Sequence, residues 1–190
     1  MMMSPNEWCV KGMKHLGRGL ILVLVIGVPV LGMRSDLTNN PADMLEKYLS
    51  LDKKGARLEA GGFEVLKPYI HWSEEPAWGQ VIIIKRFEVK HDTNEWEILN
   101  SLEARIPVTF DIVGAMLWES ATFILEPRQE TLYFRIQGIE NRWRIMEPMI
   151  LPHVGRKRAI NFVRDALLGE KDEVRMDRLR ILQQSLESAQ

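Results

Sequence analysis

The sequence predicts an α+β fold in which an N-terminal helix packs on a strongly curved, cone-like antiparallel sheet, with a C-terminal helical extension. Three observations support this prediction. A capped helical pattern begins at Pro41, alternating apolar and polar residues recur between positions 80 and 146, and helical periodicity returns after Pro152. With 190 residues and 46% hydrophobic content, the chain is long enough to bury a core and short enough for one folded domain.

The first thirty-odd residues have the order of a secretory signal. An uncharged apolar run at 20–31 ends at Gly32 and is preceded by three basic residues, Lys11, Lys14 and Arg18. We therefore predict that residues 1–33 are a signal peptide or membrane anchor, and that the protein is exported to the periplasm or the cell exterior. The run is shorter than the roughly 20 apolar residues that span a bilayer, which favours a signal peptide. Gly32 gives only a loose cleavage site, so retention as an inner-membrane anchor stays open.

Composition and motifs exclude several classes of protein. The chain has 25 Lys and Arg against 26 Asp and Glu, so it lacks the overall positive field that recruits nucleic acid. Its single cysteine, Cys9, precedes the apolar run, which leaves the exported part without a disulfide or a cysteine-based metal site. The H-E-x-x-H, P-loop and dinucleotide-binding motifs are absent from the sequence. We predict no cofactor, no metal and no nucleic-acid partner.

Local signals place the first helical elements. Asn39 and Asn40 are favourable N-caps, Pro41 suits a first helical position, and the apolar residues that follow share one face. We expect a helix over residues 41–51. Glycines interrupt the next segment, so residues 53–62 are predicted to form a loop or a broken second helix.

Alternating segments place the strands. Residues 80–90 predict a strand that ends in the polar turn 91–94. The clearest period of two runs from Trp96 to Ile112, and its length predicts a bend or bulge near Asn100 or Pro107. The remaining expected elements are strands at 121–125 and 131–137 joined by a turn at 127–130, a strand at 142–146, a helix that ends at Gly169, and a tail helix over 171–186.

The closing strand carries the phrase Asn141-Arg142-Trp143-Arg144-Ile145 before Pro148. With the preceding helix, broken helical region and bent strands, it resembles the superfamily of nuclear transport factor two-like domains, which are cystatin-like. The resemblance implies a cone over residues 34–152 with a pocket on the concave side of the sheet. The predicted helical extension at 153–190 exceeds the minimal family fold. The superfamily includes ketosteroid isomerases, dehydratases and epoxide hydrolases as well as non-catalytic subunits of bacterial envelope complexes, so the fold leaves the function open.

Six residues are candidates for ligand binding. Lys85 and Asn100 interrupt apolar strand phases, and a second group is rich in aromatic and titratable side chains: Tyr69, His71, Trp72 and Trp78. A desolvated lysine or a histidine beside carboxylates can act as a base. Alternatively, Lys85 reaches solvent where the sheet bends, Asn100 is a bulge residue, and the aromatic side chains pack under the sheet. The residues allow no catalytic assignment.

These patterns favour an exported bacterial envelope protein whose domain is non-catalytic and binds a partner protein or a small apolar ligand. The alternative is a cofactor-free isomerase, dehydratase or hydrolase that uses a histidine or an acid, such as Asp111, in the cone pocket. A third hypothesis is an assembly subunit that keeps its leader as an anchor and docks through its tail helix.

Overall fold

The computed structural model describes residue 37 and residues 40–189, which belong to one compact unit, Arg34–Gln190. The predicted leader at residues 1–33 lies outside the described residues. Among the helices of residues 40–189, none is long and apolar enough to cross a membrane.

The first helix, α1 (Pro41–Lys53), begins where the sequence predicts it. The Asn40 side chain accepts a hydrogen bond of 2.9 Å from the Ala42 backbone N–H, and Pro41 occupies the first turn. One face of α1 is buried through Ala42, Leu45, Tyr48, Leu49 and Asp52. The glycine-interrupted segment that follows forms only short turns, η2 (Ala56–Leu58), α2 (Phe63–Leu66) and η3 (Lys67–Tyr69), which confirms the predicted broken helical region.

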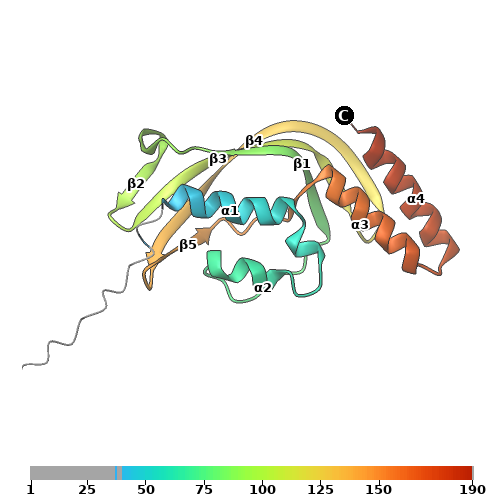
Figure 1. Cartoon of the computed structure of the whole chain (residues 1–190). Helices are drawn as coiled ribbons and strands as arrows, with labels where there is room; N and C mark the ends of the chain where they lie inside the picture. The colour runs from blue at the N-terminus through green and yellow to red at the C-terminus, as the bar shows by residue number, and fades with distance from the viewer. Residues whose placement is uncertain (1–36, 38–39, 190) are drawn as a thin grey trace, which may run out of the picture. The chain divides into compact units, whose positions relative to one another are not determined.

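Six strands form one strongly curled sheet that arches over α1 (Figure 1). They are β1 (Gln80–Val89), β2 (Glu97–Asn100), β3 (Glu103–Leu117), β4 (Thr122–Ile139), β5 (Arg142–Glu147) and β6 (His153–Gly155). Their order is β5-β4-β3-β1-β6, with β2 paired to β3. The predicted α+β class, with a helix on a curved sheet, is confirmed. The sheet is mixed, however, because the chain crosses to the far edge after β5 and β6 then runs parallel to β1.

Two strand boundaries differ from the sequence prediction. The long alternating segment forms the β2–β3 hairpin, whose turn is fixed by Asn100: its side chain accepts the Leu102 N–H and donates to Glu103, both at 2.9 Å. The predicted turn at 127–130 lies inside the continuous strand β4. Its polar residues and Pro127 are tolerated there because β5 pairs with β4 only from Arg135 onward, so this stretch is an exposed edge.

Two bulges bend the sheet where β1 pairs with β3. Ile84 pairs with Ile112, whereas Lys85 and Val113 both fall out of the β1–β3 register. A bulge increases the local twist and turns a side chain out of the regular alternation. Lys85 is exposed as a result, which is the alternative that the sequence left open for this residue.

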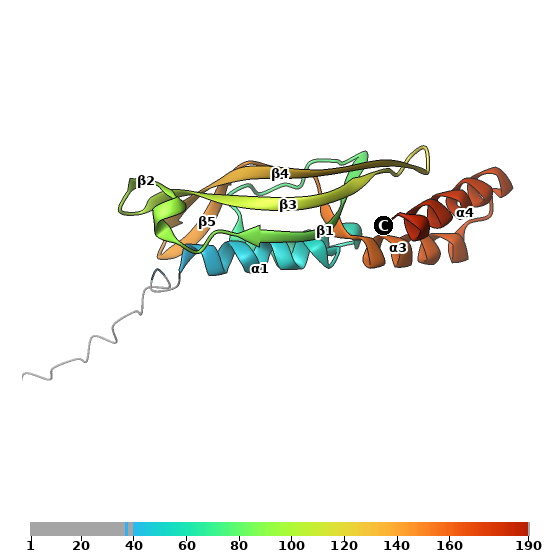
Figure 2. The ribbon, with the colours of Figure 1, turned by 90° about the horizontal axis from the view of Figure 1, so that it is seen from above.

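Two apolar cores lie on opposite faces of the sheet. The first lies between α1 and the concave face, and its fully buried aromatic side chains are Tyr48, Phe110 and Phe134. The second lies between the other face and the helices α3 (Arg156–Gly169) and α4 (Glu173–Ser188). Successive residues of β1 alternate between them, Ile82 in the first core and Ile83 in the second. Figure 2 shows α3 and α4 at one end of the sheet. These two helices are the C-terminal helices that the sequence predicts.

Candidate functional site

A cleft of about 850 Å³ opens beside the end of β6. Six of its lining side chains are cationic: Lys53, Lys54, Lys85, Arg156, Lys157 and Arg158. The rest of the lining consists of Ser50, Ile84, Val113, Gly155 and Asn161, so no carboxylate belongs to it among the described residues. We call this hollow the basic cleft.

The edge of the sheet creates the basic cleft. β6 pairs with β1 only from Ile82 to Ile84, and Gly155, opposite Ile84, is the last residue of β6. The chain then turns into α3, so this edge of β1 is left uncovered by β6 from Lys85 onward. The end of α1 also lies close to Gly155, since a Cβ at this position would be in van der Waals contact with the Lys53 carbonyl oxygen, 3.4 Å away. The end of α1, the bulge of β1 and the start of α3 therefore meet at one place.

The first turn of α3 has an unusual charge. Its N-cap residue is Gly155, which has no side chain to cap the helix, and the first turn contains no acidic residue. Arg156, Lys157 and Arg158 occupy that turn instead. A helix N-terminus carries a partial positive charge and exposed N–H donors, so acidic side chains or bound anions stabilise it and cations oppose it. This arrangement favours an external anion.

Most of the cations in the basic cleft form no salt bridge with the described residues. Arg158 pairs with Glu59 at 2.8 Å, and the Lys53 ammonium lies 5.8 Å from the centre of the Phe87 ring. The other four, Lys54, Lys85, Arg156 and Lys157, form no salt bridge with the described residues. Neighbouring like charges repel one another unless an anion neutralises them.

A second cationic feature lies beside the cleft and is organised differently. Arg57 donates from Nε and Nη2 to the two carboxylate oxygens of Asp52, at 2.8 and 2.7 Å. Its Nη1 and Nη2 also donate to the carbonyl oxygens of Ile150 and Leu151, at 2.8 and 3.0 Å. Asp52 further accepts the His153 backbone N–H at 2.9 Å. We call Asp52, Arg57 and His153 the buried junction, since it ties the end of α1 to the strand β6.

Burial shapes the titration of the buried junction. Although desolvation opposes the charge of Arg57, the hydrogen bonds to Asp52 raise the pKa of the guanidinium above its ordinary value. Desolvation lowers the pKa of His153, whose ring packs 4.5 Å from that of Phe110. His153 Nδ1 lies 2.7 Å from the Leu151 carbonyl oxygen, which can only accept, so Nδ1 carries the proton of the neutral ring. These hydrogen bonds join the end of α1 to β6, so the junction has a structural role.

The structure places the six predicted ligand-binding residues at separate positions. Lys85 lines the basic cleft. Trp78 donates to Glu75 at 3.2 Å and lies beneath the Arg57 guanidinium, and Asn100 is at the tip of the β2–β3 hairpin. Tyr69 and Trp72 are half-buried against the first core, and His71 is exposed with its backbone N–H bonded to the Ile145 carbonyl at 3.0 Å. His71 and Trp72 line one hollow and Tyr69 lines another, so only Lys85 reaches the basic cleft.

Asp111, the acid considered for catalysis, is held by its neighbours on the sheet. Its carboxylate accepts hydrogen bonds from Arg86 and, at 2.7 Å, from Gln129. The hydrogen bond from Arg86, followed by the one from Gln129, lowers the pKa of Asp111 below its ordinary value. A carboxylate stabilised in this way is a weak proton acceptor at neutral pH.

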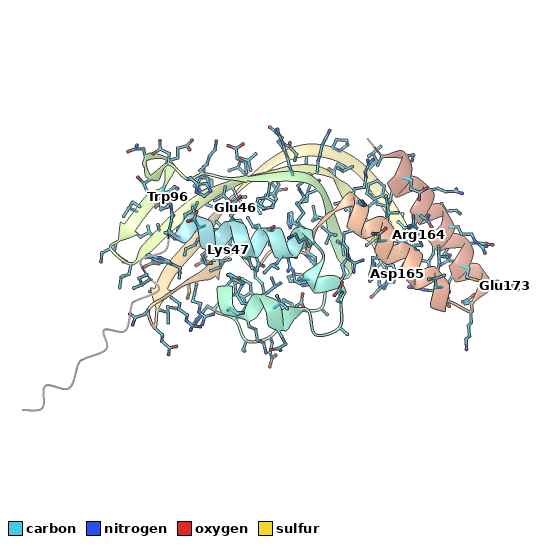
Figure 3. The ribbon with its side chains drawn as sticks, in the orientation of Figure 1. Glu46, Lys47, Trp96, Arg164, Asp165 and Glu173 are labelled. Carbon is cyan, nitrogen blue, oxygen red and sulfur yellow. The ribbon has the colours of Figure 1, made fainter. Side chains whose placement is uncertain are left out.

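One exposed group of side chains has the donor types of a metal site. The ligand atoms of Asp43, Glu46 and His91 all lie within 4.8 Å of one another, with His91 Nε2 3.3 Å from Glu46. Figure 3 labels Glu46 on α1 near the end of the sheet that carries Trp96. All three side chains are exposed, and their contacts with one another account for their positions as surface ion pairs.

Sequence reasoning missed the basic cleft, although one local signal pointed to it. Three consecutive cations, Arg156 to Arg158, follow a glycine at a helix start, where acidic residues are expected. The other cations come from segments that are distant in sequence, so spacing alone could not group them.

The fold and site together define an α+β protein with a half-barrel sheet, compatible with a cone-like fold, and a cationic cleft where α1, β1 and α3 meet. Comparisons of this chain with protein-family models, with curated proteins and with solved structures found no match.

Proposed function

We propose that this protein is an exported, non-catalytic binding domain that holds a ligand with an anionic group in the basic cleft. The observation that carries the proposal is the set of four cations without salt-bridge partners in the described chain, two of which lie in the first turn of α3. Holding these like charges together costs free energy in the free protein. A bound anion would offset that cost. It would also accept hydrogen bonds from the backbone N–H groups at the start of α3.

The packing of the cone supports a site at its edge and not at its centre. Helix α1 occupies the concave side of the sheet, where its Leu45, Tyr48 and Leu49 side chains are at most 1% exposed. Phe110 and Phe134 fill the same core, with ring centres 6.4 Å apart. A core packed in this way offers a poor location for a substrate pocket, since side chains already fill the space that the sheet encloses.

The chemistry of the remaining candidates also supports binding over turnover. Asp111 is engaged by Arg86 and Gln129, and His71 is exposed on a different part of the surface. Neither Asp111 nor His71, the acid and the histidine considered for the alternative isomerase, dehydratase or hydrolase, lines the basic cleft. The apolar face of α4, the helix that the assembly hypothesis would use for docking, buries Leu179, Leu182 and Leu186 within the chain itself.

Export rests on the basic, apolar and small-residue order of residues 1–33. Cell fractionation followed by intact-mass measurement of the protein from its own cells tests this part of the proposal. We expect the protein outside the cytoplasm, and a mass that lacks about the first 32 residues would show that the leader is removed. Recovery of the full-length chain from the cytoplasm alone would contradict export.

Calorimetric titration with pyrophosphate tests the binding site. We expect Arg156→Gln/Lys157→Gln to weaken binding by at least tenfold, because two uncompensated cations are removed from the basic cleft. The matched control is Arg164→Gln, which removes a cation from the same helix outside the cleft (Figure 3) and should leave the affinity unchanged.

Two results would contradict this proposal. One is equal pyrophosphate affinity in the double variant and in the control. The other is turnover of a ketosteroid, epoxide or hydroxyketone substrate that is lost in His71→Ala or Asp111→Ala, since such turnover would place a reaction in residues that the proposal leaves inactive.

A further inference from the structure

We infer that the ligand of the basic cleft is an amphipathic anion with a single alkyl or acyl chain, whose charged head binds at the start of α3. This inference rests on the proposed function and adds the chemical class of the ligand. Its evidence is the size of the cleft, the lysine stems along one of its walls, and the hollow that continues from it.

The cleft is too large for a simple inorganic anion. Its volume of about 850 Å³ lies within the range of about 300–1,000 Å³ that is typical of sites for drug-sized ligands. A phosphate at the first turn of α3 would contact Arg156 and Lys157 and leave most of this space to water. A ligand that fills the cleft needs a body as well as an anionic group.

The lining away from α3 is suited to an apolar body. Ile84 and Val113 belong to the apolar cores and reach the cleft at the double bulge. Lysine side chains present methylene stems to apolar matter while their ammonium groups stay in water, and Lys53, Lys54 and Lys85 surround this part of the cleft. The cleft thus has lysine stems along one wall and three consecutive cations at the start of α3.

A second hollow extends the cleft across the sheet. It has a volume of about 390 Å³ and shares Lys85 and Val113 with the basic cleft, so the two adjoin at the bulge. Ile112 and Pro127 add apolar surface to it. Apart from Lys85, which both hollows share, its charged side chains are already paired: Asp111 with Arg86, and Arg128 with Glu126 at 3.2 Å and Glu130 at 3.4 Å. The charge contrast orients the ligand, with its head at α3 and its chain toward Pro127.

The lining disfavours a nucleotide as the anion-bearing ligand. Proteins hold unpaired bases by stacking them on aromatic side chains and by hydrogen bonds to the base edges. The described residues that line the basic cleft include no aromatic side chain, and Ser50 and Asn161 are its only neutral polar side chains. An alkyl chain needs neither kind of contact.

Titrations of the full chain with octyl phosphate, inorganic phosphate and octyl glucoside test the inference. We expect octyl phosphate to bind at least tenfold more tightly than inorganic phosphate, because burial of about two methylene groups is enough for that gain. Octyl glucoside, which has the chain without the charge, should bind at least tenfold more weakly than octyl phosphate. The leader is common to all variants, so differences between variants report on the cleft.

Variants locate the head and the chain separately. Arg156→Gln/Lys157→Gln should lower the affinity for octyl phosphate and for inorganic phosphate by at least tenfold. Arg164→Gln should change neither affinity. Pro127→Glu should lower the affinity for octyl phosphate by at least threefold and leave the affinity for inorganic phosphate unchanged. The same substitution at the exposed Pro68, outside both hollows, is the matched control.

The outcomes separate this inference from the function on which it rests. If inorganic phosphate binds in a manner that depends on Arg156 and Lys157 but octyl phosphate binds no more tightly, the amphipathic ligand is wrong and the anion site stands. Equal affinities for octyl glucoside and octyl phosphate would also overturn the inference. If the double variant changes the affinity for no anion, both the inference and the proposed function fail.

Discussion

Two cationic regions lie side by side at the end of α1, and they handle charge in opposite ways. In the buried junction, the Arg57 side chain is 3% exposed, and its guanidinium donates to both oxygens of Asp52 and to two backbone carbonyls. In the basic cleft, Lys54, Lys85, Arg156 and Lys157 face solvent without a salt bridge in the described chain. The difference indicates that the first region serves the fold and that the second is arranged for something outside the chain.

The buried junction should give the largest effect. Arg57→Ala and Asp52→Ala should each lower the free energy of unfolding by about 3–5 kcal/mol, because either leaves an uncompensated charge buried. The double variant should lose less than the sum of the two. Urea denaturation measures all three. Arg158→Ala is the control, and its exposed pair with Glu59 should cost less than about 1 kcal/mol. If the two single variants lose little unfolding free energy and the double variant loses their sum, the buried junction does not stabilise the fold as we describe.

The pH dependence of stability sharpens the same comparison. Burial lowers the pKa of His153 in the folded state, so the unfolded chain binds more protons and stability is lost as the pH falls below about 6.5. The contribution of this one group has a slope of up to about 1.4 kcal/mol per pH unit. The hydrogen bond to the Leu151 carbonyl and the charges of Asp52 and Glu130 oppose this lowering of the pKa, and the charge of Arg57 supports it.

His153→Gln should remove this slope between pH 6.5 and 5, as measured by urea denaturation at each pH. His71→Gln, which replaces an exposed histidine outside the junction, should retain it. A wild-type stability that stays flat between pH 7 and 5 would contradict a neutral, buried His153.

The smallest expected effect is a gain in stability within the basic cleft. Lys157→Glu should raise the free energy of unfolding by about 0.3–1 kcal/mol, because it places an acid in the first turn of α3. The same variant should abolish pyrophosphate binding. Arg164→Glu, in the middle of α3, should change neither quantity appreciably. A destabilised Lys157→Glu would show that this cation serves the fold, and the contrast between the two regions would disappear.

Much of the fold followed from local signals. The start of α1 was predictable because Asn40 and Pro41 act on the backbone next to them, and β1 because its alternation matches a pleated strand. The β2–β3 hairpin was missed because alternating apolar residues continue through its turn. The continuity of β4 was missed because Pro127 and its polar neighbours suit an exposed edge as well as a turn.

The candidate site was less accessible to sequence reasoning. Lys85 was singled out because it broke an apolar strand phase, and the structure places it in the basic cleft. The aromatic cluster from Tyr69 to Trp78 was dense in sequence, but its side chains are divided among three hollows. Density along the chain is therefore a weak guide where the backbone turns repeatedly, as it does between α2 and β1.

The sequence by itself determined the order of the elements and the faces that they bury, because helix caps, turns and periodicity act over a few residues. Only the tertiary structure decided which distant charges meet. Asp52 reaches His153 across 101 positions, and the basic cleft gathers cations from α1, β1 and α3. That assembly depends on the crossover that brings β6 to the edge of β1, a long-range pairing that local patterns do not encode.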